Sequence, residues 1–487
     1  MTEPSVRGMD RRSRRGLLKK LPMPQQDEMP VRPNLFQRIR YSIFPGTLRT
    51  EKVREGYRRL FNSLILHFRP RNVPEETLRW TLTWGLGGMA LVLVFLLLGT
   101  GVLLKFFYQP FPDKAYESIL LLQKEVVFGR LIRNIHHWSA NALIIVAFLH
   151  LLRVFFTGAF HAPRQFNWVI GATSFLVILF SNFTGYLLPW DQLAFWAITI
   201  CTGMLEYMPG IGLWLQGLIQ GGPEVGPGTL SNFYAIHTAI LPASLLILMP
   251  FHFWRIRKVG GLVVPRPAGQ DSGQRGTSVP AIPNLLVREI VVALVLIASM
   301  LVFSMIFNAP LGSKANPGLS PNPTKAPWYF MGIQEMLLHF HPGFALFVIP
   351  ALMLVALIAL PYIDYQANTA GVWFASVKGR QMAFVAALAA LIGTPLAILV
   401  DEYLVEFAAR LPAVPTWVTN GLLPFALLVV VTAAFYIFMK RQYKASNTDT
   451  VQMVFVLLLV AFLVLTVTGI WFRGTGMKLM WPWNIGA

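Results

Sequence analysis

Long apolar segments separated by short polar stretches make up most of the chain from about residue 80 onward. Each is about 20 residues long or slightly longer, which is the length that an α-helix needs to cross a bilayer. The pattern therefore predicts an all-α fold, a polytopic transmembrane helix bundle. Nine spans are expected, at 80–107, 127–157, 167–188, 233–256, 286–308, 343–363, 382–401, 416–439 and 451–472.

Basic residues indicate how these spans are oriented. They follow the second, fourth, sixth and eighth spans, on the side of the basic N-terminal tail. An excess of Lys and Arg marks the cytoplasmic loops of membrane proteins, so the N-terminus is expected in the cytoplasm. The opposite loops (109–126, 189–232, 309–342 and 402–415) are longer and poorer in basic residues.

The composition agrees with this interpretation and excludes other classes. The 487 residues are 55% hydrophobic and only 13% charged, about half the charged fraction of a soluble protein. The net charge of +19 would suggest nucleic acid in a soluble protein. Here we attribute it to cytoplasmic Lys and Arg beside the lipid bilayer, and no nucleic-acid partner is expected. One cysteine, Cys201, excludes an internal disulfide and a Cys-ligated iron–sulfur cluster.

Two spans each hold a pair of widely spaced histidines, in a place where an ionisable side chain is costly and suggests function. His136 and His150 are fourteen residues apart, and His237 and His252 are fifteen apart. At about 100° and 1.5 Å per residue, each pair shares a helix face at depths about 21–22 Å apart. Two such helices side by side offer two pairs, His136 with His237 and His150 with His252. Each pair fits a planar metal macrocycle with two axial imidazoles. The alternative is four unrelated, hydrogen-bonded histidines.

Glycines and arginines near these histidines also favour a large flat ligand. Two glycines in the first span and two in the third repeat at fourteen residues, and glycine lets another group approach the backbone closely. These are Gly87, Gly101, Gly171 and Gly185. Small-residue helix packing is the alternative. Arg133 and Arg153 each lie three residues from a histidine of the second span and are candidate partners for haem propionates.

At these residues the sequence resembles cytochrome b of the quinol–cytochrome c and quinol–plastocyanin oxidoreductases. The stretches LIRNIHHWSANALIIVAFLHLLRVFFTGAF and TLSNFYAIHTAILPASLLILMPFHFWRIRK are similar to the family's second and fourth helices. TGYLLPWDQLAFWA is similar to the end of the third helix and the start of the quinol-site loop. The resemblance implies two b-type haems with bis-histidine ligation, a quinol oxidation site on the outer side and a quinone reduction site on the inner side.

The sequence departs from the family at two places. The photosynthetic branch holds an extra haem on a cysteine of its first helix, where this chain has about Gly85, so no covalent haem is expected from this chain. The family's Pro-Glu-Trp-Tyr motif aligns with residues 326–329, where Pro327 replaces the glutamate.

That replacement changes the prediction for the quinol site. Oxidation of a quinol releases two protons, so the site needs a base. Glu335 is the nearest downstream carboxylate and the predicted proton acceptor. An ion pair between Glu335 and a nearby lysine is the alternative, and Asp191 could accept the proton instead. Tyr186 and Tyr329, with Trp190, are expected to line the cavity.

Four regions are expected along the chain. They are a basic cytoplasmic tail with an amphipathic segment (1–78), a di-haem four-helix cytochrome b core (79–262), a C-terminal cytochrome b region with the quinol-site loop (263–365) and three additional spans (366–487). The additional spans hold no histidine and are interpreted as packing, lipid or partner surface. They suggest a bacterial version of the family, in the inner membrane.

The sequence is therefore interpreted as a respiratory electron-transport subunit of a quinol:cytochrome c oxidoreductase. Electrons would pass from quinol at the outer face through the two haems to a quinone at the cytoplasmic face, coupled to proton translocation. The missing glutamate favours menaquinone. The resemblance implies a Rieske iron–sulfur subunit, a c-type cytochrome and a homodimer of the complex.

Two alternatives remain open. The first is a complex without a Rieske protein that feeds a multihaem cytochrome or another dehydrogenase. The second is a proton-coupled transporter with buried histidine relays.

Overall fold

The chain divides into two units, Met1–Phe68 and Arg69–Ala487. The computed structural model describes residues 34–43, 72–265, 277–365, 371–405 and 410–484. The described part of the first unit is one helix, α2 (Leu35–Ile43). Asn34 caps it, because its Oδ1 accepts from the Gln37 amide at 2.9 Å while Gln37 Oε1 accepts from the Asn34 amide. The amphipathic segment predicted at 53–68 lies outside the described residues.

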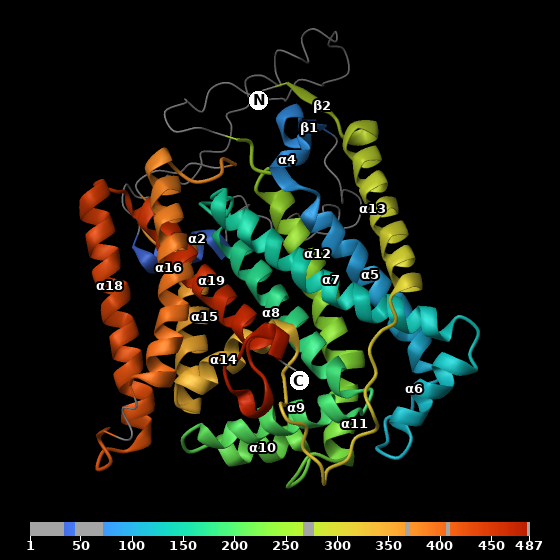
Figure 1. The fold of residues 1–487 in the computed structure, drawn as a ribbon. Coiled ribbons are helices and arrows are strands. Elements are labelled where there is room, and N and C mark those ends of the chain that lie inside the picture. Colours follow the sequence, from blue (N-terminus) through green and yellow to red (C-terminus); the bar gives the residue numbers. More distant parts are fainter. Residues whose placement is uncertain (1–33, 44–71, 266–276, 366–370, 406–409, 485–487) are drawn as a thin grey trace, which may run out of the picture. The chain divides into compact units, whose positions relative to one another are not determined.

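Nine helices in the described residues of the second unit are long and apolar enough to cross a membrane. The predicted all-α membrane bundle with nine spans is therefore confirmed (Figure 1). The spans are α5 (Leu86–Lys105), α7 (Gly129–Phe156), α8 (Gln165–Leu187), α11 (Pro227–Ala235) continued by α12 (Leu241–Lys258), α13 (Ala281–Ile306), Phe344–Tyr362 with α15 (Ile349–Ala359), α16 (Val377–Tyr403), Val418–Tyr443 with α18 (Leu423–Tyr443), and α19 (Asn447–Trp471).

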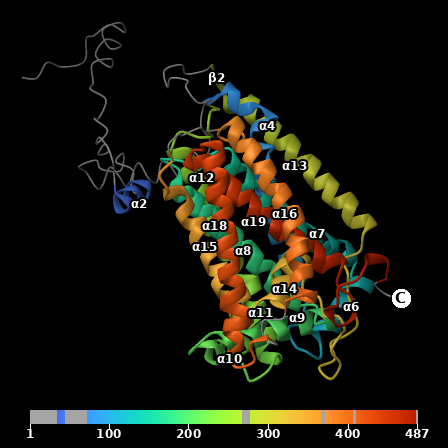
Figure 2. The ribbon, with the colours of Figure 1, turned by 60° about the vertical axis from the view of Figure 1, so that its left-hand side comes forward.

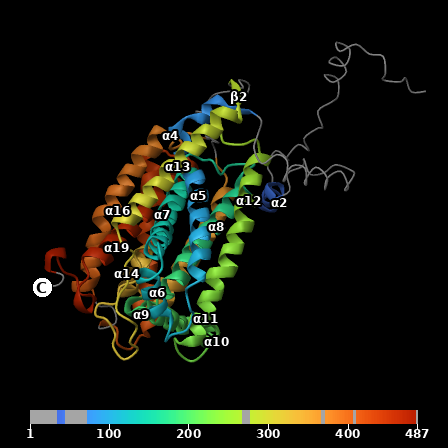
Figure 3. The ribbon, with the colours of Figure 1, turned by 90° about the vertical axis from the view of Figure 1, so that its right-hand side faces the viewer.

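Short elements lie at both ends of the second unit (Figures 1 and 3). At the end called here the β end, β1 (Asn72–Pro74) pairs antiparallel with β2 (Ser278–Pro280). The opposite end, called the α10 end, carries α6, α9 and α10. Their bounds are Ala115–Lys124, Gln192–Gly203 and Gly212–Gln220.

The first predicted span is broken near its start. The short helix α4 (Trp80–Thr83) ends where Trp84 and Gly85 take the left-handed backbone conformation, with φ of 55° and 65°. Left-handed residues terminate an α-helix. The membrane helix α5 therefore begins at Leu86 and not at residue 80.

Three spans contain one wide π-helical turn just before a proline. The turns are Ile236–Ile240, Phe344–Val348 and Val418–Leu422, and the prolines that follow are Pro242, Pro350 and Pro424. A proline has no N–H to donate and its ring clashes with the carbonyl four residues earlier. A wider turn moves that carbonyl away, which explains why the bulges occur at these positions.

The spans form two packed groups. In the first, α5 packs along α7 and α8 along α12, and α7 also contacts α8. Leu93, Leu143, Ile178 and Leu245 are buried between these four helices. In the second group, α16 lies along α19 (Figure 2). A shared cluster at the β end joins the groups, and it includes Phe155, Trp168, Met382 and Met453.

The short helix α14 (Met331–His339) crosses α19 at close range. Gly332 on α14 lies against Phe462 and Thr466, and Gly469 on α19 lies against Met331. Small residues at a crossing let two helix backbones approach closely. The additional spans are therefore packed directly against the segment that precedes the sixth span.

This crossing gives a stability prediction. A Cβ at Gly332 would lie 2.7 Å from Phe462 Cε2 and from Thr466 Oγ1. Gly332→Ala should therefore lower the free energy of unfolding by about 1–3 kcal/mol, as overpacking does. The measurement is the thermal midpoint of the purified protein. Gly393→Ala on α16 is the control, because nothing lies within 4 Å of that Cβ. Equal midpoints for the two variants would contradict the packing argument.

Candidate functional site: paired histidines and a buried ionic cluster

The structure brings His136 on α7 beside His237 on the neighbouring helix. Their ring centroids are 6.2 Å apart and the ring planes are 74° apart. Two metal–imidazole bonds of about 2.0 Å place ring centroids roughly 6 Å apart, so one metal ion fits between the two rings. His150 and His252 form the second pair, near enough to interact electrostatically. In the described residues, no group of three or more His, Cys, Asp or Glu side chains could hold a metal.

The π-helical turn explains how a fifteen-residue spacing matches a fourteen-residue one. His237 lies within the turn Ile236–Ile240, and a π-bulge adds one residue to an otherwise regular α-helix. With that residue absorbed, His237 and His252 have the helical phase of a fourteen-residue pair. Pro242 therefore helps set the depth and the direction of the His237 ring.

Hydrogen bonds fix the ring nitrogens of the His136–His237 pair. His237 Nδ1 lies 2.9 Å from the Ser181 carbonyl oxygen, which can only accept, so Nδ1 carries the proton. Thr100 Oγ1 donates to the Leu96 carbonyl and accepts from His136 Nδ1 at 2.9 Å. With Nδ1 protonated, the Nε2 lone pair is available as a metal ligand. Within the described part of the chain, neither Nε2 makes a hydrogen bond.

The four predicted glycines each face one of the four histidines. A Cβ on the glycine would come within 3.4 Å or less of the imidazole Cε1, and within 2.5 Å at Gly185. The sequence analysis expected these glycines to make room for the flat face of a haem. In the structure they make room for the imidazole rings of the histidines. The contacts are Gly87–His150, Gly101–His136, Gly171–His252 and Gly185–His237.

The two predicted arginines have different partners. Arg133 donates to the carbonyl oxygens of Ala309 and Pro310 at 2.8 and 2.6 Å, so it holds the start of the long loop after α13. Arg153 donates Nε to the Leu82 carbonyl at 2.7 Å, while its Nη2 is buried and has no hydrogen-bond partner among the described residues. An unpaired buried guanidinium nitrogen suits an anionic group such as a carboxylate. In the part of the chain that the structure describes, His150 Nδ1 is likewise buried without a hydrogen-bond partner.

The predicted quinol-site residues gather at the α10 end. Tyr186 lies within electrostatic range of both Asp191 and Tyr329. Asp191 uses both carboxylate oxygens structurally, since it caps α9 through the Ala194 amide and accepts from the Gly312 amide, each at 3.0 Å. Trp328 Nε1 donates to Asn141 Oδ1 on α7 at 2.7 Å, which fixes the segment that holds Tyr329.

Glu335 lies at the centre of a buried ionic cluster. The carboxylate is fully buried, and Arg473 binds both of its oxygens, with Nε at 3.1 Å from each and Nη2 at 2.7 Å from Oε1. His339 lies between Glu335 at 3.4 Å and Asp401 at 2.7 Å. The predicted role of Glu335 as proton acceptor stays a prediction. The structure has the ion pair that was its alternative, but with an arginine as the partner.

Several site residues were not predicted from the sequence. Arg473, Asp401 and Glu402 come from the three additional spans and the segment after them. A signal was present, because Arg473 is a basic residue on the side where basic residues are scarce. Thr100 and Ser181 were missed because their role depends on hydrogen bonds to histidines on other helices.

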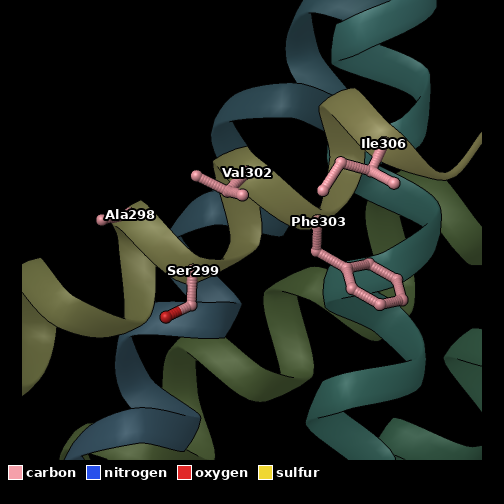
Figure 4. Close-up of a pocket in the computed structure, with 5 residues that line it drawn as sticks. All are labelled: Ala298, Ser299, Val302, Phe303 and Ile306. Carbon is pink, nitrogen blue, oxygen red and sulfur yellow. The ribbon is translucent and has the colours of Figure 1, made fainter.

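A separate groove of 430 Å³ lies on α13 (Figure 4). Its lining residues come from that one helix and are mostly apolar: Ala298, Ser299, Val302, Phe303 and Ile306. It contains no histidine or carboxylate, so we do not count it as part of the site.

Comparisons with known proteins point to one family. The family model described as cytochrome b/b6/petB matches residues 74–260. Cytochrome b6 of Prochlorococcus marinus (strain AS9601) is 42% identical over 36% of this chain and 80% of its own length. The menaquinol:cytochrome c reductase cytochrome b subunit of Geobacillus thermodenitrificans is 44% identical over 36% of this chain and 78% of its own length.

Two further comparisons extend into the C-terminal half. A cytochrome bc complex cytochrome b subunit from Chlorobaculum thiosulfatiphilum is 33% identical over 63% of this chain and 72% of its own length. A chain of a hyperthermophilic respiratory Complex III is similar in fold, with a TM-score of 0.59 and 21% identity, covering 85% of this chain and 96% of that one.

The ionic cluster predicts a pH dependence of stability. Burial lowers the pKa of His339, but the hydrogen bonds to Asp401 and Glu335 outweigh this and raise it from 6.5 to about 9. Because the folded-state pKa is the higher one, its contribution to stability is fully present below about pH 6.5 and is lost as the pH rises through about 9. The thermal midpoint of the protein should fall over this range.

In His339→Gln the thermal midpoint should fall less between pH 6.5 and 9. The matched control is His341→Gln, because His341 Nδ1 accepts from the Gly343 amide and pairs with no carboxylate in the described residues. Equal slopes for the His339 variant and the unmodified protein would disprove the linkage.

Proposed function

Because this chain belongs to the cytochrome b family, we propose that it carries out quinol oxidation as the cytochrome b subunit of a bc-type respiratory complex. The observation that carries the proposal is the His136–His237 pair, with ring centroids 6.2 Å apart and Nδ1 atoms already bonded to Thr100 and Ser181. Such a pair offers two free Nε2 lone pairs inside an apolar bundle, which suits an axially ligated haem.

The residues present fit two b-type haems. His136 and His237 would hold one at the depth of Gly101 and Gly185, and His150 and His252 the other at the depth of Gly87 and Gly171. The unpaired Nη2 of Arg153 supports a role as partner of a haem propionate. When bound, two such haems supply one-electron redox chemistry at two depths of the membrane.

We place the β end in the cytoplasm of a bacterial inner membrane. Arg164 lies in the loop between α7 and α8, and Arg257 and Lys258 end α12. Arg164 donates to the carbonyl oxygens of Gly261 and Val259, just after α12, so these basic residues lie at one end of the bundle. Basic loops stay cytoplasmic. The α10 end then faces outward, so the His136–His237 pair lies beside the outer quinol site and His150–His252 near an inner quinone site.

At the outer site the chain's own residues bind the quinol and accept its proton. Tyr186 and Tyr329 would line the quinol site, and burial raises the pKa of Tyr329, so its hydroxyl stays protonated as a donor. Glu335 would take the proton from a quinol hydroxyl. Burial raises the pKa of Glu335, but hydrogen bonds from His339 and Arg473 outweigh this and lower it. The carboxylate is therefore charged and ready to accept at neutral pH.

A low pKa also means that Glu335 does not retain a proton for long. His339 lies 3.4 Å away and is followed by Asp401, whose side chain is 36% exposed. Because His339 is already protonated at neutral pH, it would first release its Nδ1 proton to Asp401 and only then take the proton from Glu335. This order of transfers would carry the proton towards the aqueous face, in keeping with coupling to proton translocation.

We favour menaquinol as the substrate. The departure from the family's glutamate suggests a low-potential quinone, and the Geobacillus thermodenitrificans relative is named a menaquinol:cytochrome c reductase subunit. The proposed partners are a Rieske iron–sulfur subunit and a c-type cytochrome, in a homodimer of the complex.

Haem content tests the central proposal. The purified protein should contain two b-type haems per chain by pyridine haemochromogen assay, because there are two histidine pairs. His237→Leu and His252→Leu should each retain about one haem, while His341→Leu, outside the spans, should retain two. Full haem content in both span variants would contradict the ligand assignment.

Quinol turnover tests Glu335 separately. General-base catalysis contributes about 10²–10⁴-fold to rates, so Glu335→Gln should lower quinol oxidation per haem by about 10²-fold. The amide keeps one acceptor oxygen for Arg473 but cannot take the proton. Near-normal turnover would show that another group accepts it, and Asp191→Asn is then the next variant to measure.

A further inference from the structure

The segment just after the last span contacts the loop that carries the proposed quinol site. Lys325 Nζ donates to the Ile470 carbonyl at 2.9 Å, and the Gly476 amide donates to Asn322 Oδ1 at 2.6 Å. Arg473 lies between these two contacts in sequence. Residues 470–477, called here the C-terminal clamp, therefore hold the loop at several points.

Arg473 is the main contact of the clamp. It is 1% exposed, and every nitrogen of its guanidinium has an acceptor. Nε and Nη2 donate to Glu335, and Nη1 donates to Glu402 Oε2 at 2.7 Å and to the Met477 carbonyl at 3.0 Å. A guanidinium can bind a carboxylate through two parallel hydrogen bonds, which fixes orientation as well as distance.

Helix packing adds a second, independent constraint on Glu335. Gly332, one turn before Glu335, contacts Phe462 and Thr466 of α19, and Gly469 contacts Met331. The same helix, α19, leads directly into the clamp. Backbone packing and the Arg473 bonds thus act on the same short helix, α14.

A buried ion pair of this kind adds little net free energy of unfolding, so stability alone does not explain it. Removing two charges from water costs several kcal/mol per ion, and an apolar replacement is often as stable. Such a pair is better explained by a need for one defined geometry. The group whose geometry it defines here is the Glu335 carboxylate.

We infer that Arg473 is a positioning residue for quinol oxidation, and that the three additional spans complete the quinol site through the C-terminal clamp. The inference rests on the proposed function, because it assigns to Arg473 a role exerted through Glu335. In this role Arg473 holds the carboxylate charged and in place, while Glu402 and the Met477 carbonyl hold Arg473.

The charged groups around Glu335 set the sign of the expected pH effect. Arg473 and His339 bond it directly, Lys325 lies within electrostatic range, and Glu402 and Asp401 follow behind Arg473 and His339. Without Arg473, the buried Glu335 carboxylate keeps His339 as its directly bonded cation and loses the other. Its pKa then rises, and a reaction that needs the charged form loses activity at a higher pH.

The test is Arg473→Gln in membranes that contain the whole complex, with a reduced short-chain naphthoquinone as substrate and activity expressed per b haem. We expect kcat/KM to fall at least 10-fold at neutral pH, and the acid limb of its pH profile to move up by about one pH unit or more. Arg473→Lys keeps the charge without the two-pronged contact, and should show a smaller shift of the acid limb.

Two controls separate position from folding. Arg410→Gln removes an exposed positive charge from the loop after α16 and should leave activity and pH profile unchanged. Glu335→Gln/Arg473→Gln removes both buried charges and should fold even where Arg473→Gln does not. Its activity should equal that of Glu335→Gln alone, since Arg473 then has no carboxylate to position.

Two results would overturn the inference. One is an Arg473→Gln variant with normal activity per haem and an unshifted acid limb. The other is a double variant that recovers activity well above Glu335→Gln. Both leave the proposed function intact. If the unmodified complex does not oxidise the naphthoquinol at all, the proposed function itself fails.

Discussion

The polar ring of histidine inside an apolar bundle is the constraint on which the first half of the structure depends. In the His136–His237 pair, one ring nitrogen of each histidine has a partner on a neighbouring helix, while the other makes no hydrogen bond within the described residues. Thr100 and Ser181 are these partners on α5 and α8, where a helical hydroxyl or carbonyl has spare capacity to accept. The ring must also fit between the helices, and a side chain at Gly101 or Gly185 would collide with it. The π-turn before Pro242 then gives the second helix the phase of the first.

The part of α7 around His136 also organises the α10 end. Arg133 lies one turn before His136 and bonds the first carbonyls of the loop after α13, and Asn141, one turn after His137, bonds Trp328 further along that loop. The loop is therefore attached to the helix that holds His136 both at its start and again at Trp328. Its far end, at Glu335, is out of reach of α7 and is bonded instead from the second group of spans. The segment proposed to carry the quinol site thus bridges the two groups.

How much of this could be predicted depends on whether a residue acts within its own helix or across helices. Nine spans follow from runs of apolar residues, and the histidine pairs follow from spacing along two helices, because both properties are local. The break at Trp84 and the phase of His237 depend on local backbone geometry at Gly85 and Pro242 that a count of 100° per residue does not include. Thr100, Ser181 and Arg473 could not be found from spacing, because their partners lie on other helices.

The interpretation of the additional spans as packing, lipid or partner surface follows from the same limitation, since they lack histidine and their few charges look interfacial. The proline at position 327 and the additional spans can be explained together, by where the proposed proton acceptor and its counter-charge come from in the chain. A proline offers no side-chain base, so the proposed acceptor comes from later in the chain. On its own short helix, α14, Glu335 has one cationic neighbour, His339 at 3.4 Å. A carboxylate buried there without a counter-charge would be protonated and inert as a base. Arg473 adds a second positive charge, and it lies in the segment that follows the last of the three additional spans. The carboxylate at position 335 and the chain extension that carries Arg473 are then two features of one proposed quinol site.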